Sequence, residues 1–128
     1  MIFDFRQVAV QPHASLNHVI KTIDSAGIQI ALVVDNAGVL VGTVTDGDIR
    51  RGLLKGVGMN SLVSEVMNSA PKILTEGTTE ETACDFMHAN HLNHVPIINN
   101  KGQVISLVLN NSPKEIEKRS TPIILMAG

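Results

Sequence analysis

Residues 40–51, with the sequence LVGTVTDGDIRR, decide the fold that we expect for this chain. The three residues 43–45 are all β-branched, which favours a strand. From Ile49 onward the apolar residues follow helical spacing until Gly56. The sequence therefore predicts a strand that passes into a helix through the polar residues 45–48, Thr-Asp-Gly-Asp.

The start of this helix has two interpretations. The free N–H groups of a first helical turn, together with the helix dipole, attract a phosphate group. Thr45 and Asp48 also have the spacing of a capping box, in which the two side chains bond the first amides of their own helix. The spacing alone favours the capping box, so the rest of the chain has to indicate whether a ligand also binds here.

The composition excludes several classes of function. The chain has 128 residues, a net charge of −2 and only three aromatic residues, so it has neither the basic surface nor the stacking platform of a nucleic-acid-binding protein. No apolar run is long enough to cross a bilayer, and the N-terminus lacks a signal-peptide pattern, so we expect no membrane partner. A single cysteine, Cys84, rules out an internal disulfide and fits the reducing cytoplasm.

The chain predicts the element order β-α-β-β-α, and then repeats it. In the first copy we expect a strand at 8–10, a helix capped by Ser15 and ended by Gly27, strands at 28–34 and 39–45, and a helix at about 48–55. A shift of 64 residues superposes this pattern on a second copy without a gap, so that the turn residues Asn36 and Gly38 fall on Asn100 and Gly102. A short helix at 61–68 would join the copies. The sequence therefore predicts an internal duplication with an α+β fold, in which two β-α-β-β-α repeats pack with pseudo-two-fold symmetry.

The duplicated chain resembles a tandem pair of cystathionine-β-synthase (CBS) domains, also called a Bateman module. The resemblance covers residues 1–118, which we divide into repeat 1 (1–58) and repeat 2 (59–118). It rests on the repeated element order, the Val66-Met67 lead-in to the second copy, the strand at 95–99, and the pattern Gly42-x-Val44-Thr45-x-x-Asp48.

The resemblance implies a regulatory domain that binds an adenine nucleotide (AMP, ADP or ATP), or in some relatives S-adenosylmethionine, and that forms a homodimer. In such domains the residue at Thr45 contacts phosphate and the residue at Asp48 holds the ribose hydroxyls. The chemistry agrees, because a carboxylate accepts hydrogen bonds from two adjacent hydroxyls. Backbone amides at 46 and 47, and arginine side chains at 50 and 51, suit a phosphate. The nucleotide-binding set that we expect is Thr45, Asp48, Asp46, Gly47, Arg50, Pro12, Ile30, Ala31 and His94.

The second copy departs from the pattern. Gly42, Thr45 and Asp48 become Ser106, Leu109 and Ser112 after the shift of 64. The hydroxyl at position 45 and the carboxylate at position 48 are both lost. We therefore expect one competent nucleotide site and one degenerate site, and a late, short last helix that starts near Ser112.

The last residues, 119–128, resemble the opening of another domain. The apolar stretch at 122–128 ends in Ala-Gly, as in the first strand of a sugar-phosphate nucleotidyltransferase of the mannose- or heptose-phosphate guanylyltransferase type. The resemblance implies that the pair controls an attached nucleotidyltransferase domain. The alternative interpretation is an ordinary terminal strand.

Other functions remain as alternatives. Cys84, His88, His91 and His94 could form a metal cluster, but solvated histidines at a helix end explain the same pattern, so we expect no metal. We find no catalytic constellation and expect no enzymatic activity from this chain alone. A structural docking or dimerisation module without a ligand stays open beside the nucleotide sensor.

Overall fold

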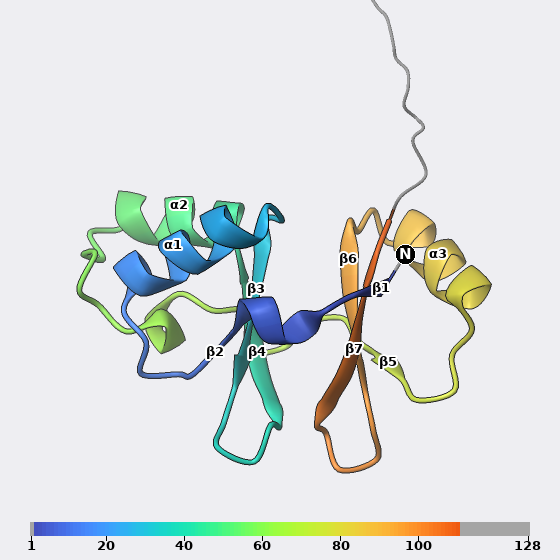
Figure 1. Cartoon of the computed structure of the whole chain (residues 1–128). Coiled ribbons are helices and arrows are strands. Elements are labelled where there is room, and N and C mark those ends of the chain that lie inside the picture. The colour runs from blue at the N-terminus through green and yellow to red at the C-terminus, as the bar shows by residue number, and fades with distance from the viewer. Residues whose placement is uncertain (1, 111–128) are drawn as a thin grey trace, which may run out of the picture.

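Two β-sheets face each other, and the helices cover their outer sides (Figure 1). The computed structural model describes residues 2–110. The first sheet has the order β2-β3-β4, and the second has the order β1-β7-β6-β5. The strands are β1 (Ile2–Phe3), β2 (Ala9–Val10), β3 (Ile30–Val34), β4 (Leu40–Thr45), β5 (Leu74–Thr75), β6 (His94–Ile98) and β7 (Val104–Leu109). The helices are α1 (Leu16–Ala26), α2 (Asp46–Leu54) and α3 (Glu80–Ala89), with 3₁₀ turns η1 (Phe5–Val8) and η2 (Val63–Glu65).

Polar caps define where the helices begin. The Ser15 hydroxyl accepts a hydrogen bond from the His18 amide at the start of α1, and the Thr79 hydroxyl accepts one from the Thr82 amide at the start of α3. Each cap satisfies an amide that has no partner within its own helix. Gly27 ends α1 in the left-handed conformation, with φ of 76°.

The two repeats share one hydrogen-bonding register. Ile30 pairs with Thr45 in the β3–β4 hairpin, and His94 pairs with Leu109 in the β6–β7 hairpin, which is the same pair shifted by 64 residues. The irregularity between Val33 and Val34 also recurs between Ile97 and Ile98. The structure confirms the α+β fold with two superposable repeats, and the shift of 64 locates the matching strands.

The ends of the two hairpins bond to each other symmetrically. The Leu40 amide donates to the Gly102 carbonyl, and the Val104 amide donates to the Gly38 carbonyl, at 2.9 and 3.1 Å. These pairs exchange places under the shift of 64, so the pseudo-two-fold axis passes between Val39 and Gln103, which form an isolated bridge.

Each repeat also completes the sheet of the other. The N-terminal strand β1 crosses to pair antiparallel with β7 of the second repeat (Figure 1). In return, Asn68, in the segment that enters the second repeat, bridges Thr43 on β4 of the first repeat. Hydrophobic packing also joins the two repeats. A central hydrophobic cluster contains Val8 and Leu32 from the first repeat and Leu107 from the second.

Two local expectations differ from the structure, and two others are not tested by it. The helix α2 begins at Asp46, two residues earlier than expected, because Thr45 caps it. The short helix expected at 61–68 is only the 3₁₀ turn η2. The helix expected near Ser112 and the strand at 122–128 lie outside the described residues. Within residues 2–110, no helix is both long and apolar enough to cross a membrane.

Candidate functional site

A cavity of about 400 Å³ lies between the two repeats, beside the start of α2. The first repeat supplies one wall from the start of β3, the end of β4 and the first turn of α2. The second repeat supplies the other wall from residues 66–72, which we call the entering segment, and from the start of β6. The lining residues are Gln29, Ile30, Thr43, Thr45, Asp46, Gly47, Asp48, Asn68, Pro71, Lys72, His91, Leu92, Asn93, His94 and Pro96.

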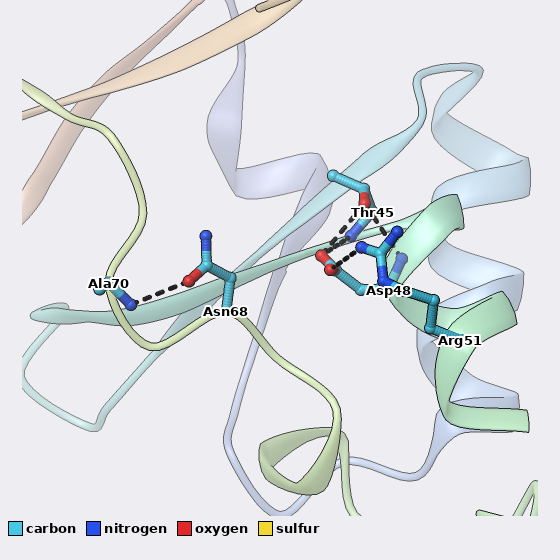
Figure 2. Close-up of polar contacts among 5 residues, drawn as sticks. All are labelled: Thr45, Asp48, Arg51, Asn68 and Ala70. Carbon is cyan, nitrogen blue, oxygen red and sulfur yellow. Dashed lines mark hydrogen bonds and ion pairs between the residues drawn. The ribbon is translucent and has the colours of Figure 1, made fainter. Parts of the chain in front are cut away.

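Thr45 and Asp48 form both halves of a capping box at the start of α2 (Figure 2). The Thr45 amide and hydroxyl both donate to Asp48 Oδ2, at 3.0 and 3.1 Å, and the Asp48 amide donates to Thr45 Oγ1 at 3.3 Å. The capping interpretation from the sequence is therefore confirmed. The same two side chains also line the cavity, so capping does not remove them from the site.

Arg51 neutralises the other oxygen of the Asp48 carboxylate. Arg51 Nη2 donates to Asp48 Oδ1 at 2.6 Å, within one turn of the same helix (Figure 2). The guanidinium also lies over Gly47, because a Cβ atom at position 47 would be 3.3 Å from Arg51 Nη1. The Asp48 side chain is only 17% exposed, and both of its oxygens have protein partners.

Gly42 allows the entering segment to cross β4 next to the cavity. A Cβ atom at this position would lie 2.7 Å from Met67 Sδ and 2.9 Å from the Asn68 carbonyl oxygen. Because the Asn68 oxygen accepts the Thr43 amide at 3.0 Å, the backbone there cannot move away without losing that bond. The glycine of the sequence pattern thus fixes where the second wall approaches the first.

The opposite wall carries basic and amide side chains. Lys72 comes from the entering segment, His91 from the turn after α3, and His94 from the start of β6. Burial disfavours the charged imidazole and lowers the pKa of His94 from its usual 6.5. At neutral pH, this side chain is therefore an uncharged hydrogen-bonding group in the unliganded protein.

The cavity gathers six of the nine residues expected from the sequence. Thr45, Asp46, Gly47, Asp48, Ile30 and His94 line it. The other three lie elsewhere: Ala31 is fully buried in the hydrophobic core of the first repeat, Arg50 is exposed on α2, and the Pro12 carbonyl accepts the Ser64 amide at 3.3 Å.

Sequence reasoning missed the residues from the entering segment and from the end of α3. Asn68, Pro71 and Lys72 follow the recognised lead-in, but no periodic pattern shows that they fold back over β4. The internal repeat could have indicated part of the other wall. Gln29 falls on Asn93 after the shift of 64, and both residues line the cavity near its pseudo-two-fold centre.

A second hollow occupies the position related by the pseudo-symmetry. Its volume is about 300 Å³, and Leu109 and Asn110 stand where Thr45 and Asp46 stand in the main cavity. Leu109 packs against the central hydrophobic cluster, together with Phe5 of η1. Among residues 2–110 no group of three or more His, Cys, Asp or Glu side chains is placed to hold a metal ion.

The family model described as "CBS domain" matches residues 5–55 and again residues 63–109. The chain belongs to the CBS domain family. The two matches coincide with the two structural repeats, which together form a CBS domain pair. The CBS family is the one that the motif at 42–48 and the lead-in at 66–67 indicated.

Curated and solved relatives agree with this assignment. A probable arabinose 5-phosphate isomerase of Haemophilus influenzae is 30% identical over 105 residues, which are 80% of this chain but only 31% of the relative. A CBS domain protein of Pyrobaculum aerophilum, solved in complex with AMP, has a TM-score of 0.69 at 17% identity, covering 80% of this chain and 79% of that one. A CBS domain pair solved with 5′-methylthioadenosine and S-adenosyl-L-methionine has a TM-score of 0.68 at 20% identity, covering 80% and 83%.

Proposed function

We propose that this CBS pair is a regulatory module that binds an adenine nucleotide in the cavity beside α2. The observation that carries the proposal is the position of Thr45 and Asp48, which stand together on the wall of a cavity between the repeats. Junctions between packed units are common ligand sites. Two solved relatives of the same fold hold AMP or S-adenosyl-L-methionine with 5′-methylthioadenosine, which supports an adenosine-containing ligand.

Different residues contact the ribose, the phosphate and the base of the nucleotide. Asp48 accepts hydrogen bonds from the ribose hydroxyls, and the amides of Asp46 and Gly47, which α2 does not use itself, donate to phosphate. Apolar side chains such as Ile30, Leu92 and Pro96 enclose the base. The volume of about 400 Å³ falls in the range of small-ligand pockets.

Binding has to rearrange the contacts of Asp48. A carboxylate has about four lone-pair sites, and three are taken by the Thr45 amide, the Thr45 hydroxyl and Arg51. A ribose with two hydroxyl donors therefore displaces one of these partners. Arg51 is the partner that can leave most easily, because its side chain is 66% exposed.

Calorimetry with AMP, ADP, ATP and S-adenosylmethionine tests the proposal. We expect at least one of them to bind the native chain, and Asp48→Asn to weaken that binding at least tenfold. Asp85→Asn is the matched control, because Asp85 is exposed on α3 and does not line the cavity. Binding that survives Asp48→Asn would contradict the site.

A structural module without a ligand is the second candidate. It is favoured by the observation that both Asp48 oxygens already have protein partners. Absence of binding for all four compounds would support this candidate over the nucleotide sensor.

The whole protein's role is a further part of the proposal. We propose that the pair forms a homodimer in the cytoplasm and controls an attached enzyme domain. The exposed apolar side chains around the end of α2 support an association surface, with Leu54 being 82% exposed. The tail at 122–128 supports a nucleotidyltransferase as the attached domain, whereas the curated relative from Haemophilus influenzae is named an isomerase, so the attached activity stays a prediction.

A further inference from the structure

The acidic and the basic side chains of the cavity lie on opposite walls. The first-repeat wall carries two carboxylates, Asp46 and Asp48, and the second-repeat wall carries Lys72, His91 and His94. Arg51 neutralises Asp48 at 2.6 Å, but no cation among residues 2–110 lies within ion-pair distance of Asp46. Within the same residues, no carboxylate pairs with Lys72. The cavity is therefore acidic on the α2 side and basic on the opposite side.

The α2 side alone is a weak anion site. Its first turn already carries Asp46 and Asp48, whose negative charges occupy the favourable end of the helix dipole. The single hydroxyl proton of Thr45 is donated to Asp48 Oδ2. A phosphate at this helix start thus meets two free amides but also a carboxylate without a counter-charge, so the balancing positive charge has to come from elsewhere.

His91 adds an independent observation. It is the one non-glycine residue of the described chain with a positive φ, at 57°. The equivalent residue in the first repeat is Gly27, which adopts φ of 76° with no steric cost. The Leu92 amide bonds the Met87 carbonyl at 2.8 Å, so this helix end is tightly formed and holds His91 in its conformation. A histidine that is held in this strained conformation at the wall of a cavity indicates a role for its side chain.

We infer that Lys72 and His91 form the anion-binding wall of the cavity and hold the phosphate-bearing end of the nucleotide. The inference rests on the proposed function and adds two residues from outside the recognised motif. Lys72 supplies a permanent positive charge, and the His91 imidazole supplies an N–H donor. The nucleotide therefore spans the cavity, with its ribose at Asp48 and its phosphate between the amides of α2 and the basic wall.

Comparing the binding affinities of AMP and adenosine isolates the contribution of the phosphate group. We expect Lys72→Gln and His91→Gly each to weaken AMP binding about five- to tenfold while adenosine binding changes less than about twofold. The loss for Lys72→Gln should shrink as salt is raised, because the lost interaction is ionic. Lys101→Gln, at an exposed turn residue, and His13→Gln, at another, are the matched controls and should leave both affinities unchanged.

The thermal stability of His91→Gly separates a binding role from a structural one. Glycine removes the strain of the left-handed conformation, so the melting temperature should not fall although AMP affinity does. Equal losses for AMP and adenosine, or unchanged AMP affinity in both variants, would overturn the inference while leaving the nucleotide site in place. If none of AMP, ADP, ATP and S-adenosylmethionine binds the native chain, the proposed function fails and the inference fails with it.

Discussion

At the scale of single residues, one side chain can serve both a helix and a ligand. Thr45 caps α2 and lines the cavity, whereas Thr79 caps α3 and lies away from it. The two threonines have the same local role, so they provide a matched pair for separating stability from binding.

We expect Thr45→Ala and Thr79→Ala to lower the free energy of unfolding by similar amounts, about 0.5–2 kcal/mol each, because each removes an N-cap hydroxyl. Only Thr45→Ala should also weaken nucleotide binding. Urea unfolding followed by circular dichroism gives the first quantity, and calorimetry with AMP gives the second. Equal effects of the two variants on binding would show that Thr45 acts only through the fold.

His94 should make stability depend on pH. Burial lowers its pKa in the native state from the usual 6.5, so below that pH the unfolded chain takes up the proton more readily than the native one. The stability present above pH 6.5 is therefore lost as the pH falls towards the native pKa. His94→Gln should flatten this part of the profile of unfolding free energy between pH 8 and pH 5, whereas His13→Gln should leave it in place. A profile that His94→Gln leaves unaltered would contradict the assignment.

At the scale of elements, the crossing of β4 by the entering segment depends on one glycine. Gly42→Ala places a methyl group against the Met67 sulfur and the Asn68 carbonyl oxygen. We expect a loss of about 1–3 kcal/mol in unfolding free energy, the usual cost of overpacking. Gly58→Ala is the control, because its new Cβ atom would meet only Ser61 Oγ, at 3.9 Å. A Gly42→Ala variant as stable as the control would show that the crossing segment can shift.

The sequence predicted the regular elements and missed the irregular ones for a physical reason. Alternating and helical apolar patterns record which face is buried, so β3, β4, α1 and the shift of 64 could all be read directly. The capping box at Thr45 was recognised, and the earlier start of α2 follows from it. The path of residues 66–72 depends on sheet pairing with a distant strand, which no local pattern encodes. That path carries Lys72 into the cavity, and so the basic wall was largely missed.

At the scale of the whole molecule, the exchange of edge segments makes the repeats depend on each other. The strand β1 pairs with β7, Asn68 bridges β4, and the central cluster takes side chains from both repeats. An isolated repeat would expose these surfaces to water, and the second repeat would also lose the edge strand β1 of its sheet.

We therefore expect the chain to unfold in a single cooperative transition, with the same midpoint by circular dichroism and by calorimetry. Fragments 1–58 and 59–128, expressed separately, should lack a cooperative transition, because fragment 59–128 loses β1 and fragment 1–58 loses the bridge at Asn68. Two separate transitions in the intact chain, or a cooperatively folded fragment, would contradict this mutual dependence.

The two hollows share Gln29, Asn93 and His94. Leu109 and Asn110 line the second hollow alone, so the three shared residues are the ones that lie against both. A ligand that shifts one of these shared side chains in the main cavity would therefore change the shape of the second hollow as well.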